Sequence, residues 1–135
     1  MAYIAGDVVE LVCNHPTLGI YRYQAKAGES FTIDKGGIRN DDSADGITGG
    51  GQVILKKNMV RSSVEGPVAV DMLGDMELSG TNDLAASADP GTWVMSCASG
   101  AVYRMLGWPV GDLQSDTNTA QMKLKVAGSN LEQIA

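Results

Sequence analysis

Short runs in which apolar and polar residues alternate recur along this 135-residue chain, and they limit its fold more than any other feature. In the clearest run, residues 120–126, Met122, Leu124 and Val126 are apolar and the residues between them are polar. A period of two residues is that of a β-strand with one buried face. We therefore expect a strand here, with these three side chains in the core.

Six further segments carry a strand signal. Two of them are separated only by Ser99-Gly100, and a two-residue connection that contains Gly is a strong β-hairpin signal. The expected strands are residues 8–13, 20–26, 30–34, 68–73, 93–98 and 101–106.

The alternation also predicts which side chains face the interior. In residues 8–13 it places Glu10 outward, and in residues 93–98 it places Trp93 in the core. The other side chains expected to face inward are Val9, Leu11, Cys13, Tyr21, Tyr23, Ala25, Phe31 and Ile33.

One helix is expected at residues 81–88, since Thr81 or Asn82 can cap it and Pro90-Gly91 ends it. The 17 glycines and the low aromatic content suit short strands and many turns. The expected fold is a single domain over residues 1–135. It is mainly β, an antiparallel β-sandwich or barrel with one short flanking α-helix and a long loop.

The long loop is expected at residues 35–51, which are rich in Gly and Asp and have little to bury. A brief apolar run, residues 52–55, follows before Lys56-Lys57. Loops of this length in a small domain are usually functional or mobile.

Catalytic motifs are absent from the sequence. His15 is the only histidine, and no Gly-x-Ser-x-Gly nucleophile motif occurs. Cys13 and His15 supply two potential metal ligands where a structural zinc site needs four. The glycines at 49–51 lack the Lys-Ser or Lys-Thr that completes a phosphate-binding loop. We expect neither an enzyme nor a bound cofactor, and a turn histidine satisfied by hydrogen bonds.

Residues 41–46 resemble the opening of a calcium-binding loop. Asp41, Ser43 and Asp45 supply oxygen atoms, and Gly46 allows the sharp turn. Gln52 stands where a bidentate Glu would complete the coordination shell, so we expect a solvated acidic turn.

The net charge of −6, without a basic stripe, argues against binding of nucleic acid by phosphate neutralisation. Two cysteines are too few for a disulfide framework, and both are expected to be free thiols. The first residues lack the basic and apolar regions of a signal peptide, and no apolar run approaches the ~18 residues of a membrane span. We expect a protein made in a reducing cytoplasm, without contact to a membrane.

Three segments carry a resemblance to a known family. Gly28-Glu-Ser-Phe-Thr-Ile-Asp34 is followed by Gly-Gly-Ile-Arg39 and a glycine-rich loop. Gly100-Ala-Val-Tyr-Arg-Met-Leu-Gly-Trp108 follows later, and an alternating strand covers residues 120–127. In this order, over residues 20–135, the chain resembles the tail-tube proteins of Mu-like contractile phages.

This resemblance implies a structural virion protein of the phage tail, made in the bacterial host. Its subunits close hexameric rings, and the rings stack into a tube through which DNA leaves without specific binding. It implies contacts with further copies of itself and with sheath, tape-measure, baseplate and tail-terminator proteins. Residues 40–61 would form the extended loop between subunits, with Asn40, Asp41, Asp45, Gly46, Gly49, Gly50, Gln52, Lys56, Lys57 and Arg61 as its contact residues.

A tube for DNA is expected to have an acidic wall, because repulsion of the phosphates lets the duplex slide. Candidates for this acidic lumen are Glu10, Asp34, Asp71 and Glu77.

Two alternatives remain open at this point. One is another small β-rich virion component, a head–tail joining or tail-completion protein, which forms one ring where a tube stacks many. The other is a carbohydrate-binding β-sandwich, whose sugar-stacking platform would draw on Trp93, Trp108, Tyr21, Tyr23 and Tyr103.

Overall fold

The structure is a computed structural model, and it describes residues 2–74 and 76–135. The protein is mainly β, with half of its residues in strands and 8% in helix. The elements are β1 (Val8–His15), β2 (Gly19–Gln24), β3 (Thr32–Asp34), β4 (Gly37–Asn40), β5 (Lys57–Val60), β6 (Ser62–Ala69), α1 (Met76–Ala86), β7 (Gly91–Cys97), β8 (Val102–Pro109), β9 (Ser115–Asp116) and β10 (Gln121–Gln133).

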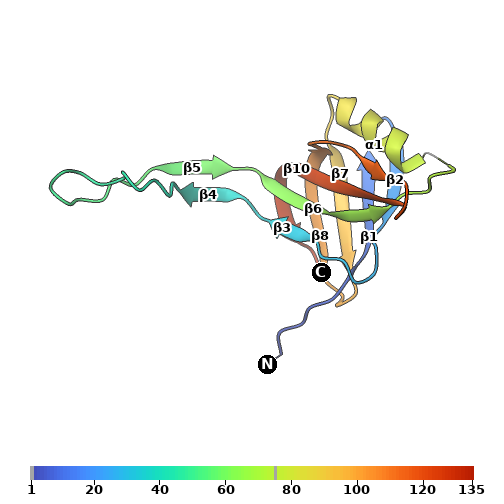
Figure 1. Cartoon of the computed structure of the whole chain (residues 1–135), viewed down its shortest axis with the longest axis horizontal. Helices are drawn as coiled ribbons and strands as arrows, with labels where there is room; N and C mark the ends of the chain where they lie inside the picture. The colour runs from blue at the N-terminus through green and yellow to red at the C-terminus, as the bar shows by residue number, and fades with distance from the viewer. Residues whose placement is uncertain (1, 75) are drawn as a thin grey trace.

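One antiparallel sheet forms the body of the molecule, with the strand order β2-β1-β7-β8-β10-β6-β3 and β9 paired with β10. The two ends of this order meet, because Ala25 just beyond β2 forms a bridge with Val68 of β6. The sheet therefore curls into a barrel-like body, and β4 and β5 form a separate two-stranded sheet outside it (Figure 1). The expected mainly β antiparallel fold is confirmed.

The interior of the curled sheet is the hydrophobic core. Met122, Leu124 and Val126 are buried, as the alternation predicts. The rings of Tyr23 and Trp93 stack with their centroids 5.8 Å apart, and both side chains are about 1% exposed. Apolar and aromatic side chains from strands far apart in sequence thus share one interior, which stabilises the closed arrangement.

Helix α1 covers one end of this interior (Figure 1). Leu84 is buried, and the Thr81 hydroxyl lies 2.7 Å from the Tyr23 hydroxyl. Thr81 also donates to the carbonyl of Glu77, so it lies inside the helix and does not cap it. The expected start at Thr81 is therefore wrong by five residues, because Thr81 finds its hydrogen-bond partners in the helix and in the core.

The strand expected at residues 68–73 is shifted toward the N-terminus. β6 ends at Ala69, so Met72 and Leu73, expected in a strand, lie in a turn. The polar-looking stretch before Val68 is strand, because Ser62 and Gly66 occupy inward positions. Ser62 satisfies its hydroxyl on the Lys35 carbonyl at 2.6 Å, and the Phe31 ring occupies the space that a side chain on Gly66 would need.

The inward assignment of Val9 is wrong. The pairing of β1 with β7 contains a bulge between Val8 and Glu10, which turns Val8 into the core and leaves Val9 exposed. The predicted hairpin is confirmed: β7 and β8 pair antiparallel, and the amide of Cys97 donates to the carbonyl of Ala101.

We expect Leu124→Asp to unfold the protein, since it places a carboxylate in the middle of the core. The loss of unfolding free energy should exceed about 4 kcal/mol, measured by urea denaturation followed by circular dichroism. Ser129→Asp, on an exposed position of the same strand, is the control and should stay near wild type.

Stability should also fall at alkaline pH. Burial raises the pKa of Tyr23 from 10.0 to about 12 and that of the Cys13 thiol from 9.0 to about 12. Because the folded state disfavours ionisation, the stabilisation is complete below pH 9 and is lost as the pH rises toward 12. Melting temperatures between pH 8 and 12 measure this loss. Tyr23→Phe should make the loss above pH 10 shallower, and Tyr3→Phe, at a fully exposed position, should not.

Candidate interaction surface: the hairpin arm

Residues 36–61, here called the arm, project from the barrel as a hairpin (Figure 1). β4 and β5 pair antiparallel from Gly37 opposite Val60 to Asn40 opposite Lys57. The expectation of an irregular loop is therefore wrong at residues 37–40. The β-branched Ile38 and Val60 suit an extended backbone, although almost no core lies beneath them.

Hydrogen bonds continue the hairpin to its tip. The amide of Asp41 donates to the carbonyl of Lys56 at 2.7 Å, and the amide of Ile54 donates to the carbonyl of Gly46 at 2.8 Å. At the tip, the amide of Thr48 donates to the carbonyl of Gln52 at 2.7 Å. With about a dozen residues per side at roughly 3.3 Å each, the arm reaches about 40 Å.

The exit of the arm from the barrel is held in a fixed geometry. The carboxylate of Asp34 accepts hydrogen bonds from the amide of Gly36 and from the guanidinium of Arg39, and these bonds lower the pKa of Asp34. Gly36 has a φ of +70°, and a Cβ at this position would lie 2.4 Å from the carbonyl oxygen of Val60. Only glycine fits this close approach between the two strands.

The arm exposes large apolar side chains along its length. Val53 is 70% exposed and Leu55 is 66% exposed, and no arm residue belongs to the core cluster. A two-stranded hairpin without a covering layer is only marginally stable in water. Exposed apolar side chains gathered in this way are typical of an interaction site. The exposed apolar residues of the arm are Ile38, Ile47, Val53, Ile54, Leu55 and Met59.

The arm also differs from the rest of the chain in charge. It carries four basic and three acidic side chains, whereas the remaining residues carry six basic and thirteen acidic ones. Lys56, Lys57 and Arg61 have no ion-pair partner among the described residues, although Lys57 donates to the side-chain oxygen of Asn40 at 3.0 Å. The excess negative charge thus lies on the barrel part.

All ten residues expected at the inter-subunit loop belong to the arm. The structure sets Asn40 opposite Lys57, and Arg61 lies at the base just after β5. The exposed apolar side chains of the arm are absent from that expectation. The sequence does indicate some of them: Val53-Ile54-Leu55 is an apolar run between a glycine-rich turn and two lysines. The neighbouring residues are too polar to form a core that would bury this run.

The four residues expected at an acidic lumen do not form one group. Glu10 pairs with Arg22 at 2.8 Å on the barrel, and Asp34 lies at the base of the arm. Only Asp71 and Glu77 come together, where the amide of Asp71 donates to the Glu77 carboxylate at 3.3 Å.

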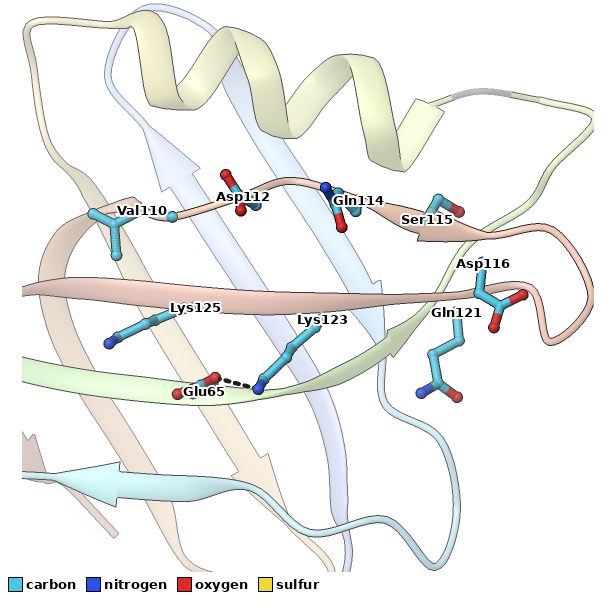
Figure 2. A pocket seen from close by; sticks show the side chains of 10 residues that line it. Glu65, Val110, Asp112, Gln114, Ser115, Asp116, Gln121, Lys123 and Lys125 are labelled. Atoms are coloured by element: carbon cyan, nitrogen blue, oxygen red, sulfur yellow. Dashed lines mark ion pairs between the residues drawn. The ribbon is translucent and has the colours of Figure 1, made fainter.

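A polar groove of about 460 Å³ lies beside β10 and β6 (Figure 2). Its central feature is an ion pair between Lys123 and Glu65 at 2.8 Å, and Lys123 lowers the pKa of that carboxyl group. The lining also carries Asp112, Asp116 and Lys125, none of which has an ion-pair partner among the described residues. Across residues 2–74 and 76–135, no three His, Cys, Asp or Glu side chains come close enough to hold a metal ion.

His15 is a structural residue with both ring nitrogens engaged. Nδ1 accepts the amide hydrogens of Thr17 and Leu18, and Nε2 lies 2.9 Å from the Ser87 hydroxyl and 3.0 Å from the Asp89 carbonyl. The side chain is almost fully buried. It ties the β1–β2 turn to the segment after α1, which agrees with the expected satisfied turn histidine.

The aromatic residues do not form an exposed platform for sugar stacking. Trp93 and Tyr23 are buried in the core, and the half-buried Trp108 donates its ring N–H to the Ser87 carbonyl at 3.0 Å. Cys13 and Cys97 are free, with Cys13 buried and Cys97 partly buried. In the part of the chain that the structure describes, no helix has the length and hydropathy to cross a membrane.

Comparison with known proteins finds no protein-family model and no curated protein that matches this chain.

Substitution at the base of the arm should show how tightly its exit is held. Gly36→Ala combines left-handed strain with a clash against Val60, whereas Gly37→Ala at φ +98° meets no atom within 4 Å. We expect Gly37→Ala to cost about 1–2 kcal/mol and Gly36→Ala to cost more. Urea denaturation measures the cost, and limited proteolysis reports opening of the arm. Equal effects of the two substitutions would contradict a close approach at Gly36.

Proposed function

We propose that the protein is a structural subunit of a phage tail tube, which forms hexameric rings that stack around a channel for DNA. The observation that carries this proposal is an apolar hairpin arm that its own barrel leaves uncovered. The resemblance of residues 20–135 to tail-tube proteins supports the same conclusion.

The arm is suited to contacts between identical copies. It leaves the barrel on one side and extends away from it, so it does not fold back onto its own body (Figure 1). A second copy provides the covering layer that the arm lacks. Burial of six exposed apolar side chains is a substantial driving force, at roughly 25 cal/mol per Å² of apolar surface. It would also order the hairpin from a marginal to a stable element.

The distribution of charge suits a conduit for DNA. The barrel part carries the acidic excess, with thirteen acidic against six basic side chains. A wall of this sign repels phosphates and gives no counterion-release gain, so DNA passes without being held. In the assembled virion the tube would contact sheath, tape-measure, baseplate and tail-terminator proteins, as in the family that the chain resembles.

Assembly of the purified chain tests the proposal. We expect sedimentation to show oligomers at rising concentration and negative-stain microscopy to show rings that stack into tubes. Replacement of residues 41–56 by Asn-Gly joins Asn40 and Lys57, which lie opposite each other, through a two-residue turn. This variant should keep its circular dichroism spectrum and melting transition but lose stacking.

Two results would count against the proposal. A wild-type chain that stays monomeric at every concentration would refute self-assembly. Single rings that never stack would favour the head–tail joining alternative.

A further inference from the structure

A second apolar surface lies far from the arm. It is a groove of about 550 Å³ between β2 and the N-terminal end of α1, here called the β2–α1 groove. Ile20 and Met76 line it with side chains 62% and 76% exposed, and Leu18 adds a third exposed apolar side chain. The body thus holds an apolar surface of the same character as the arm.

The edge of β2 beside this groove is open. β2 pairs with β1 from Gly19 to Gln24, and among the described residues no other strand pairs with it over this length. The bridge to β6 forms only at Ala25. An open edge beside an apolar groove is the arrangement that accepts an added strand, whose backbone pairs with the edge while alternate side chains enter the groove.

The charges around the groove complement those of the arm. The carboxylates of Asp71 and Glu77 lie at the N-terminal end of α1, and neither has an ion-pair partner among residues 2–74 and 76–135. On the arm, Lys56 and Lys57 directly follow the apolar run 53–55. Neither lysine has an ion-pair partner among the described residues. Arg22 also lines the groove, and its charge is paired with Glu10 at 2.8 Å. Each surface therefore presents three exposed apolar side chains next to two unpaired charges, and the signs of the unpaired charges are opposite.

The two surfaces lie on opposite sides of the barrel. In Figure 1 the arm extends to the left, whereas β2 and the N-terminal end of α1 lie at the right. An arm cannot reach the groove of its own chain, so any contact joins two copies. A contact between two unlike patches repeats head to tail and gives a ring or a filament.

We infer that the segment 53–57 of one copy docks in the β2–α1 groove of the next, with Val53 and Leu55 in the groove and Lys56 and Lys57 beside Asp71 and Glu77. This inference rests on the proposed function and names the surface that receives the arm. The polar groove of Figure 2 is a poor receptor for Val53 and Leu55, because Val110 is the only large apolar residue in its lining.

Complementation between two full-length variants tests the inference. Val53→Asp with Leu55→Asp impairs the arm and keeps the groove, and Ile20→Arg with Met76→Arg does the reverse. All four positions are exposed, so both variants should fold. We expect neither variant to assemble alone. An equimolar mixture should form a heterodimer and stop there, because it holds one working arm and one working groove. Sedimentation velocity measures the species, and Val9→Arg, at an exposed apolar position outside the groove, should assemble like wild type.

The outcomes separate this inference from the proposed function. If the wild type assembles, the arm variant does not and the groove variant does, the arm docks elsewhere and the inference is wrong while the proposed function stands. A wild-type chain that never assembles would overturn both.

Cross-linking gives a second measurement that does not depend on disruptive charges. In a Cys97→Ser background, Val53→Cys and Met76→Cys chains are mixed under mild oxidation. We expect a disulfide between the two copies, and none when Val9→Cys replaces Met76→Cys. Tubes that form without a cross-link between positions 53 and 76 would overturn the inference. So would a cross-link between Met76→Cys and Ile4→Cys, since it would place the exposed N-terminal segment, and not the arm, in the groove.

Discussion

The barrel depends on burial of one face of a single curved sheet around the stacked rings of Tyr23 and Trp93. The two residues come from β2 and β7, and β1 lies between these strands, with Leu11 opposite Tyr23 and Cys13 opposite Trp93, so the stack spans three strands. The Tyr23 hydroxyl then reaches Thr81, so the same contact fixes α1 over the end of the barrel. Sheet closure and helix placement therefore follow from one buried aromatic pair, whose area and hydrogen bond outweigh the loss of conformational freedom.

The arm uses the same strand chemistry without such an interior. Backbone hydrogen bonds between its two sides recur from base to tip, yet Ile54 and its apolar neighbours face water. Hydrogen bonds that exchange with water add little net stability, so the arm lacks the main term that holds the barrel together. The barrel therefore buries its own apolar surface, whereas the arm leaves its apolar surface uncovered.

Much of the fold follows from period-two patterning, and its failures have local causes. The burial of Leu124 and its neighbours and the turn at Ser99-Gly100 are readable because side-chain alternation and turn chemistry act over few residues. The bulge after Val8 changes which side chains of β1 face the core, and no sequence motif announces it. Gly66 breaks the apolar alternation of β6, because the Phe31 ring fills the inward space where a side chain would lie. The position of the arm is readable from its glycines and lysines. Its hairpin form and the β2–α1 groove are not, because both arise from pairing and from packing between distant segments.

The opposite placement of the arm and the β2–α1 groove has a consequence for any assembly built from them. Copies joined arm to groove all point the same way, so the finished object has polarity. One end displays only unoccupied arms and the other only unoccupied grooves. Two different capping partners are then needed to stop growth and to attach neighbours. The partner at the arm end needs an apolar and acidic surface, and the partner at the groove end needs a segment that resembles the arm.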